Sequence, residues 1–466
     1  MMQRLHLLAR LAVVLALVLP CARVHAGGLY LFDRGARALG RGGAFIAAPD
    51  DPSALWYNPA GLAESKRQII GDAVLPILFA DFQRLEADGR YAPKVAARPT
   101  PIPIPTLAMS HDFGLDDVTF GFGIFAPNVL LMNWERSVNG GKDPSPARYS
   151  LLGLKGSILA NLVAGLAYRG FGPLSIGADV QLVTGTFQAQ TALSACDGVV
   201  CSFPEQRDFD AYATVSTFPA LGVTGVLGMT LDLRALRLGA SLTLPYTLRG
   251  WGSLDVKLPT HPLFEDARVR GDAATLALAF PTIVRVGSEL RPFPGLRMEG
   301  AFVWEQWSRQ KSIDIDVKGV TIENVIGIGD YGVGDLALPR NMRDIFSVRG
   351  GFELSVPRAW TWDVATEIRG GLAYEKGAFS GKTLTPLTLD TDKVVLSGGF
   401  SIGVADWLTL DAVTGYVFMT DLSVTDSTVR QPQAIRPTVE SLTTVIGNGR
   451  YTQDALFVGG GFRARL

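Results

Sequence analysis

The sequence lacks an excess of either charge and lacks long apolar runs. Its 43 Lys and Arg residues balance 44 Asp and Glu residues, so the formal net charge of −1 leaves no basic surface for nucleic acid. A helix that crosses a bilayer needs about 20 consecutive apolar residues, and the only near-unbroken run covers residues 11–19. Nucleic-acid binding and a helical membrane fold are therefore both excluded.

The chain is nevertheless apolar. Hydrophobic residues make up 47% of it, and charged residues reach only 19%, below the roughly 25% of soluble globular domains. Glycine is abundant, with 52 residues, and 24 Phe, 11 Tyr and 8 Trp supply aromatic side chains. This composition fits many strands that are joined by close turns and anchored by aromatic residues. It indicates an all-β fold of the membrane β-barrel type.

The amino end has the pattern of an export signal. Basic residues flank the start of the apolar run, a proline ends it, and small residues precede a cleavage site after Ala26. We therefore predict a signal peptide over residues 1–26. The exported chain retains two cysteines, Cys196 and Cys201. In an oxidising compartment a disulfide between them is favoured over two free thiols.

Alternation with a period of two dominates the carboxyl half. In residues 362–374 the apolar side chains fall on one face and Asp363, Glu367 and Arg369 fall on the other, which suits a wall between lipid and water. Short connections are expected at residues 113–116, 170–173, 232–234, 292–295, 355–360 and 404–406, and long ones at 85–103, 128–156, 185–218, 247–275, 308–344, 375–392 and 420–452. These connections join fourteen antiparallel transmembrane strands, with the short turns facing the periplasm.

The segment before the first strand differs from the rest. Residues 27–63 do not alternate, and they are too apolar for a disordered tail. The lumen of a barrel of about fourteen strands is too wide for wall side chains alone to fill. We therefore predict that residues 27–63 form a plug, or hatch, in the lumen, and that residues 64–466 form the barrel with long extracellular loops.

Several motifs together resemble a known family. The chain carries GARALGRGG at residues 35–43, DDPSA at 50–54, WYNPAGL at 56–62, GFGIFAP at 121–127 and GNGRY at 447–451. In this order and spacing they resemble the outer-membrane long-chain fatty acid and hydrocarbon transporters over nearly the whole mature chain. The resemblance implies a fourteen-stranded barrel, a hatch in its lumen, apolar ligand pockets and sideways release of the ligand through the wall.

The function that this resemblance implies is uptake of hydrophobic molecules across the outer membrane of a Gram-negative bacterium. The alternative is a general diffusion porin or a structural barrel, which predicts an open, charge-lined lumen without a plug. The expected partners are a fatty acid or hydrocarbon ligand, outer-membrane lipids and the barrel assembly machinery, and the protein is expected to be a monomer. The sequence leaves the identity of the ligand open.

The hatch is predicted to act as the gate. Asn58 can bond to local backbone and Pro59 fixes φ, so together they form a rigid corner, while the glycine-rich run supplies hinges. The predicted hatch residues are Gly40, Arg41, Gly42, Gly43, Asn58, Pro59, Ala60 and Gly61.

A lateral opening is predicted in the strand that carries Gly121, Gly123 and Pro127. Glycine weakens a strand and proline cannot donate to the ladder, so in a closed barrel the wall should kink or part there. The alternative is an ordinary strand that ends at Pro127. The apolar residues that follow, on a segment expected to face water, are predicted to bind ligand, the alternative being burial under neighbouring loops. They are Leu130, Leu131, Met132 and Trp134.

Catalysis, a cofactor and a metal site are not expected. Ser110, His111 and Asp112 are adjacent in the sequence, and neighbours on a strand point to opposite faces, so they cannot form a catalytic triad.

A cation for a carboxylate ligand cannot be chosen from the sequence. Arg148, Lys155 and Arg285 are candidates by position. An arginine in the lumen normally pairs with a carboxylate such as Glu289 or Glu299, and this is the favoured interpretation.

Overall fold

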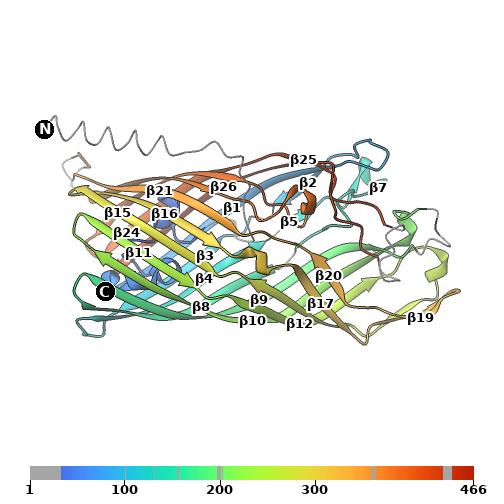
Figure 1. The fold of residues 1–466 in the computed structure, drawn as a ribbon, viewed down its shortest axis with the longest axis horizontal. Helices are drawn as coiled ribbons and strands as arrows, with labels where there is room; N and C mark the ends of the chain where they lie inside the picture. The colour runs from blue at the N-terminus through green and yellow to red at the C-terminus, as the bar shows by residue number, and fades with distance from the viewer. Residues whose placement is uncertain are drawn as a thin grey trace.

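The chain forms a closed antiparallel β-barrel of fourteen strands, as the sequence predicts (Figure 1). The structure, a computed structural model, describes residues 33–99, 101–130, 132–154, 157–196, 201, 203–357, 360–361, 364–433 and 443–466. The predicted signal peptide, Lys155 and Leu131 lie outside these residues. Within them, no helix is both long enough and apolar enough to span a bilayer.

Several wall strands consist of two segments in line. In order around the barrel, the strands are β1 (Gln68–Arg84), β2 (Val95–Pro99) with β3 (Ile104–His111), β4 (Val118–Leu130) with β5 (Met132–Trp134), β8 (Ser157–Phe171), β9 (Leu174–Ser194), β10 (Asp210–Asp232), β11 (Leu236–Thr243) with β12 (Tyr246–Lys257), β14 (Ala273–Phe280) with β15 (Ile283–Phe293), β16 (Leu296–Glu305) with β17 (Ser312–Lys318), β20 (Leu336–Pro339) with β21 (Ile345–Val356), β22 (Thr366–Glu375), β23 (Lys393–Ala405), β24 (Leu408–Met419) and β26 (Gly449–Arg465). The barrel closes through β1 and β26, which pair along their whole length.

The wall alternates between lipid-facing and lumen-facing residues. On β21, Val348 and Phe352 are exposed, while Arg349 and Glu353 are buried toward the lumen. All six predicted short connections are turns at one end of the barrel, near the first residue of β1 and the last of β26. This end is the periplasmic one, because barrels of this kind have short periplasmic turns and long outer loops.

Most of the predicted long loops are partly strand, because β2, β5, β17, β20 and the start of β26 also lie within predicted loops. Two ranges illustrate the reason. Residues 185–218 and 247–275 were expected to be loops, but β9 runs on to Ser194, β10 begins at Asp210, and β12 and β14 extend into the second range. The face of β9 that carries Val180 and Leu182 continues with Gln188 and Gln190. These strands extend beyond the lipid, where a polar residue replaces the apolar one and the alternation that marks a membrane strand disappears.

Smaller elements complete the outer end. A three-stranded sheet consists of β13 (Arg268–Arg270), β18 (Thr321–Val325) and β19 (Gly329–Gly332), and a two-stranded one of β6 (Ser137–Val138) and β7 (Asp143–Pro144). β25 (Leu422–Val424) pairs with β26. The short 3₁₀ helices of the connections are η2 (Asn139–Gly141), η3 (Arg207–Phe209), η4 (Pro262–Phe264), η5 (Trp307–Arg309) and η7 (Gly381–Thr383).

The hatch lies inside the barrel, where its helices are visible in blue behind the wall (Figure 1). Residues 33–63 of the predicted hatch are described, and this part of the chain contains α2 (Ala36–Gly40), α3 (Ala54–Tyr57), η1 (Pro59–Gly61) and α4 (Leu62–Ser65), the last of which runs on toward β1. α2 contacts β22, β23 and β24, and η1 contacts β8, β9 and β10 on another part of the wall. Nearly all of its residues up to Ala63 are buried, as expected for a segment that packs against the inner face of the wall.

Four neighbouring wall strands are interrupted at one height. The interruptions, which we call the seam, are residues 244–245, 281–282, 306–311 and 340–344. Ladder pairs join the last paired residues on the periplasmic side of each break, from Thr243 through Ile283 and Glu305 to Ile345. The seam therefore separates the membrane-spanning barrel from its outer extension on this side of the molecule.

Candidate functional site

Charged residues tie the hatch to the barrel wall. The guanidinium of Arg37 bonds to Glu353 of β21 at 2.6 and 2.8 Å and to Asp50 of the hatch at 2.5 Å. Arg297 of β16 reaches Asp50 at 2.7 Å from the wall side. Burial alone would raise the pKa of Asp50, but the charges of Arg297 and Arg37 lower it well below its usual range. These groups remain ionised and hold the hatch in place.

A second arginine of the hatch is fully buried. Arg41 lies 3.2 Å from both Glu289 and Glu299, which project from β15 and β16. Glu299 also accepts hydrogen bonds from the backbone N–H groups of Ile46 and Ala47, at 2.5 and 2.9 Å. Glu289 also pairs with Arg291 and Arg297 of the wall, both at 2.9 Å. The lumen carboxylates are thus paired, but with these arginines and Arg41 rather than with the candidate Arg285.

Asn58 fixes the second half of the hatch. Its amide nitrogen donates to the carbonyl of Ile46 at 2.9 Å and to that of Met229 in β10 at 3.0 Å, and its Oδ1 accepts from Ala60 N–H at 3.3 Å. Pro59 follows at the start of η1. The predicted rigid corner therefore bonds to the wall as well as to local backbone.

Glycines of the inner wall make room for the hatch. A Cβ on Gly121 would lie 2.9 Å from the side chain of Leu62, and one on Gly123 would lie 3.3 Å from that of Leu55. A Cβ on Gly371 would lie 2.0 Å from the nitrogen of Gly42 in the other part of the hatch. Close approach to the hatch therefore accounts for Gly121 and Gly371, whereas a Cβ on Gly123 would first meet the ring of Phe125 in the wall, at 2.6 Å.

The wall ladder fails above Gly121 and Gly123. Both glycines pair with β3 and with β8, so the ladder is intact at them and the irregularity lies toward the Pro127 end of the predicted stretch. The last pair between β3 and β4 joins Thr106 to Phe125, and the register between β4 and β8 shifts between Phe125 and Asn128. On the side of β4 that faces β3, pairing resumes only further out, between β2 and β5. The break thus begins at Ala126, next to Pro127.

The opposite side of this break is rich in proline. Residues 99–105 include prolines at positions 99, 101, 103 and 105, none of which can donate a ladder hydrogen bond. Ile104 and Ala126 pack together across the break, with Ile102 beside them. This proline run was not recognised from the sequence. Its signal is the spacing of the prolines, because a proline at every second position of a strand removes every second hydrogen-bond donor.

An aromatic pair lies between the hatch and the break. The ring of Trp56 stacks on that of Phe125, with ring centroids 5.8 Å apart and an interplanar angle of 29°. Trp56 also lines a charged cavity of about 770 Å³, counting its open mouth, together with Arg285, Arg349 and Glu305. The stacked rings thus connect a residue that lines this cavity with the last residue of β4 that pairs with β3 before the break.

An apolar pocket lies on the outer side, next to the seam. Its volume is about 530 Å³ including its open mouth. Most of its lining is apolar, with Leu154, Leu159, Thr186, Phe187, Leu278, Phe280, Ile313 and Leu387 around it. The one charged residue among the lining residues is Arg340 at the end of β20.

Arg340 is buried and lacks an ion pair among the residues that the structure describes. Burial lowers the pKa of Arg340 to about 10, and the charge of Asp390 offsets part of this shift. Arg340 therefore stays charged at neutral pH in an apolar pocket, where an anionic ligand would compensate its lost hydration. No sequence pattern indicates Arg340, because its role depends on segments that lie far apart in the chain.

The predicted ligand-binding loop is only partly described. Trp134 is 2% exposed and packs edge to face on Phe82 in an apolar cluster that also contains Leu154 and Phe280. The backbones of Leu130 and Met132 belong to β4 and β5, and Leu131 lies outside the described residues. Trp134 thus belongs to the core under the outer loops rather than to a surface that faces water.

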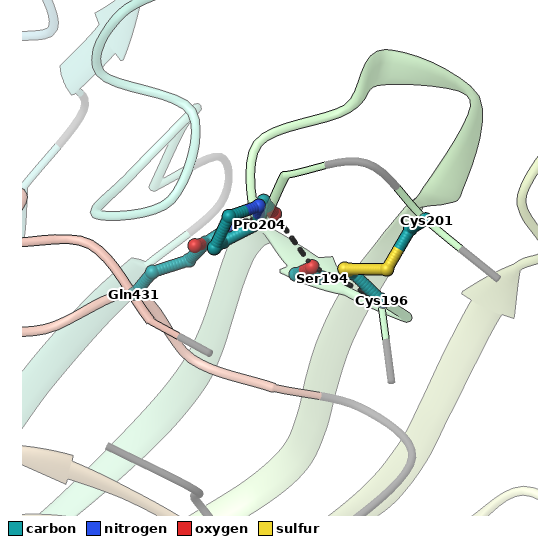
Figure 2. Close-up of a disulfide and its surroundings, with 5 residues drawn as sticks. All are labelled: Ser194, Cys196, Cys201, Pro204 and Gln431. Atoms are coloured by element: carbon teal, nitrogen blue, oxygen red, sulfur yellow. Dashed lines mark hydrogen bonds between the residues drawn. A yellow bond between two sulfur atoms is a disulfide. The ribbon is translucent and has the colours of Figure 1, made fainter. Parts of the chain in front are cut away.

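The disulfide between Cys196 and Cys201 lies in the connection after β9 (Figure 2). The carbonyl of Pro204 accepts hydrogen bonds from Ser194 Oγ and from Gln431 Nε2, both at 2.8 Å. The next residue, Glu205, bonds to Arg84, and these charge-assisted bonds outweigh burial and lower the pKa of Glu205. Pro204 and Glu205, which follow the disulfide, therefore hold outer segments from three parts of the chain together.

The remaining candidates have structural partners. Arg148 forms an ion pair with Asp210 at 2.8 Å, and Arg285 donates to Thr243 Oγ1 at 2.7 Å. His111 Nδ1 accepts from the N–H of Phe113 in the first periplasmic turn. Among the described residues, no group of His, Cys, Asp and Glu side chains could hold a metal ion.

Comparisons with known proteins agree with this architecture. The family model described as "Outer membrane protein transport protein (OMPP1/FadL/TodX)" matches residues 17–453. No curated protein matches the chain by sequence.

Solved structures resemble the chain over almost its whole length. A FadL homologue of Pseudomonas aeruginosa superposes with a TM-score of 0.74 at 15% identity, covering 94% of this chain and 100% of that one. The toluene transporter TodX of Pseudomonas putida gives 0.64 at 16% identity, with coverage of 94% and 99%. The toluene transporter TbuX of Ralstonia pickettii gives 0.60 at 17% identity with the same coverage. At these identities the likeness concerns the fold.

Proposed function

Because the chain belongs to the family of outer membrane transport proteins described as OMPP1/FadL/TodX, we propose that it takes up hydrophobic molecules through a plugged barrel and releases them sideways into the membrane. The observation that carries the proposal is the combination of a lumen filled by the hatch and a wall ladder interrupted beside it at Ala126. A general diffusion porin needs an open lumen, and the hatch residues occupy it.

Sideways release follows the preference of an apolar ligand. Each buried CH₂ group gains about 0.8 kcal/mol on leaving water, so release through a wet periplasmic exit would oppose the transfer of a long chain. A wall break that faces the bilayer keeps the chain out of water. The stacked rings of Trp56 and Phe125 lie where a ligand would leave the lumen.

We propose that the natural ligand is a long-chain carboxylate rather than a neutral hydrocarbon. The pocket beside the seam offers an apolar surface for the chain and a buried guanidinium for the headgroup. The guanidinium of Arg340 lies 5.2 Å from the centroid of the Phe379 ring, and its ion-pairing capacity is not met by a carboxylate of the described residues. A neutral ligand would not supply that anion. A carboxylate would form the charge-assisted hydrogen bonds that the guanidinium geometry favours.

The cellular setting is proposed on the same basis. The signal peptide would direct export and be cleaved after Ala26. The barrel assembly machinery would then insert the chain as a monomer among the lipids of the outer membrane. The short turns would then face the periplasm and the pocket would face the outside.

Substitution of Arg340 tests the ligand class. In the purified barrel, Arg340→Met should weaken oleate binding at least about 30-fold, since loss of one partner of a buried charge pair costs about 2 kcal/mol or more. Toluene binding should stay the same, and Arg340→Lys should recover part of the oleate affinity. Calorimetry with both ligands measures this. Equal losses for oleate and toluene would show that Arg340 only maintains the shape of the pocket.

The same arginine predicts a pH dependence. Burial raises the pKa of Asp390 to about 7, even though the charge of Lys393 acts against the shift. Asp390 is therefore mostly protonated at pH 6 and ionised at pH 8, where its charge competes with the ligand for Arg340. Oleate affinity should fall roughly fivefold between these pH values, which corresponds to about 1 kcal/mol of Coulomb interaction. Asp390→Asn should remove the decrease, and an unchanged slope in that variant would contradict the assignment.

A further inference from the structure

Three connections of the seam region lie side by side at the outer end of the membrane-spanning wall. The carbonyl of Lys311 accepts from the N–H groups of Arg340 and Asn341, at 2.8 and 2.9 Å. The N–H of Arg343 donates to Ala378 at 2.7 Å. The connections 306–311, 340–344 and 376–379 thus form one continuous surface across three neighbouring strands.

An aromatic strip lies directly below this surface. The rings of Phe302, Phe346 and Tyr374 follow one another on adjacent strands, with centroids 6.1 and 6.4 Å apart. Phe302 shares its face of the strand with the lipid-facing Met298, and Phe346 shares its face with Val348. Aromatic residues in such a position mark the boundary between lipid chains and headgroups.

Four cations lie at or just above the strip, and we call them the cationic rim. They are Arg309, Lys311, Arg343 and Lys376. The ammonium of Lys376 lies 5.7 Å from the centroid of the Phe346 ring, which places it on the lipid side of the wall. The rim therefore begins at the level of the lipid headgroups.

The helix η5 and the two residues after it direct Arg309 and Lys311 outward. Trp307 and Gln310 are 0% and 1% exposed, and residues three apart lie on the same face of a 3₁₀ helix. Arg309 and Lys311 lie off this buried face, and both are exposed. They consequently point away from the interior core.

The rim carries a local excess of positive charge. Within the described part of the chain, none of its four cations forms an ion pair with a carboxylate. The one acidic residue of the three connections, Asp344, accepts the N–H of Ser308 at 2.9 Å. Neighbouring Glu375 pairs with Lys393 at 3.2 Å. Arg343 donates to the carbonyl of Phe379 at 2.9 Å. That bond and the contact of Lys376 with the Phe346 ring leave the positive charges without a neutralising carboxylate from the described residues.

We propose that the cationic rim binds the phosphate groups of a phosphorylated lipid in the outer leaflet. Arginine and lysine side chains together complement a phosphate, and the aromatic strip below would contact the acyl chains of the same lipid. This continuity of aromatic and basic surface favours a lipid over free phosphate. The lipid would brace the seam from outside, opposite the pocket that contains Arg340.

Lipid retention by the full-length barrel tests the proposal. The protein is placed in phosphatidylethanolamine vesicles that contain either phosphorylated lipid A or its dephosphorylated form, extracted in mild detergent and weighed by native mass spectrometry. The test variant is Arg309→Gln with Lys311→Gln and Lys376→Gln. The matched control replaces three other exposed cations of the outer extension and connections, Lys257→Gln with Arg268→Gln and Lys318→Gln.

The parent and the control should retain phosphorylated lipid A, and the test variant should retain at least ten times less. Retention by the parent should fall as salt rises, a readout that needs no variant. Equal retention by the test variant, or equal retention of the dephosphorylated lipid, would overturn the proposal. So would full displacement by millimolar inorganic phosphate, which indicates a free-anion site. A loss of oleate binding with unchanged lipid retention would reassign the rim to ligand capture and also overturn it.

Discussion

Closing the wall break with a disulfide should stop transport while leaving ligand binding intact. The change is Ile104→Cys with Ala126→Cys, in a Cys196→Ser and Cys201→Ser background so that only the new bond responds to reductant. Ile104 and Ala126 pack across the break, and a bond between them replaces the missing ladder pairs. Uptake of labelled oleate by cells should fall to the level of cells without the protein and recover on reduction.

The control for this experiment is a staple in the intact ladder. Met109 and Phe122 are paired on β3 and β4, and both are exposed on the lipid side. Met109→Cys with Phe122→Cys should form a bond without changing uptake. Parental uptake by the oxidised Ile104→Cys and Ala126→Cys variant would show that the ligand leaves elsewhere.

Removal of residues 27–63 should leave a folded barrel that conducts ions freely. The wall hydrogen bonds close on themselves through β1 and β26 and do not involve the hatch. Glu289, Glu299 and Glu353 would lose their hatch arginines, but water entering the lumen would hydrate them. Single-channel conductance in a planar bilayer should rise at least tenfold.

A surface change just after the hatch serves as the control. Arg67 is exposed and pairs with Asp112 at 2.8 Å. Arg67→Gln should keep the parental conductance, since Arg67 takes no part in filling the lumen. A truncated barrel that conducts no better than the intact protein would mean that the wall or the outer loops close the pore.

The alternation of side chains accounts for what the sequence predicted of the fold. Residues such as Val348 and Arg349 face lipid and lumen in turn, so the strands and the short turns between them could be located. Where β9 and β10 leave the lipid, Gln188 and Gln190 occupy the outer face. The pattern that identifies a membrane strand is absent there, so the loops were predicted to be too long.

Less of the candidate site than of the fold could be predicted from the sequence. Gly121 and Gly123 stood out as weak points of a strand, and in the structure they face Leu62 and Leu55 of the hatch. Only the position of the hatch reveals this, and it depends on contacts between distant segments. Arg340 illustrates the same limit, because a buried cation and an exposed one are identical in the sequence.

The position of the hatch also constrains the order of assembly. α2 stands near the start of the chain, yet it packs on β22, β23 and β24, which are synthesised last, and on β1 and β26, which close the cylinder. These contacts have large sequence separations, which slows folding. The first segment to leave the ribosome is therefore among the last to reach its native surroundings. Protection of the hatch from proteases becomes a marker of completed assembly.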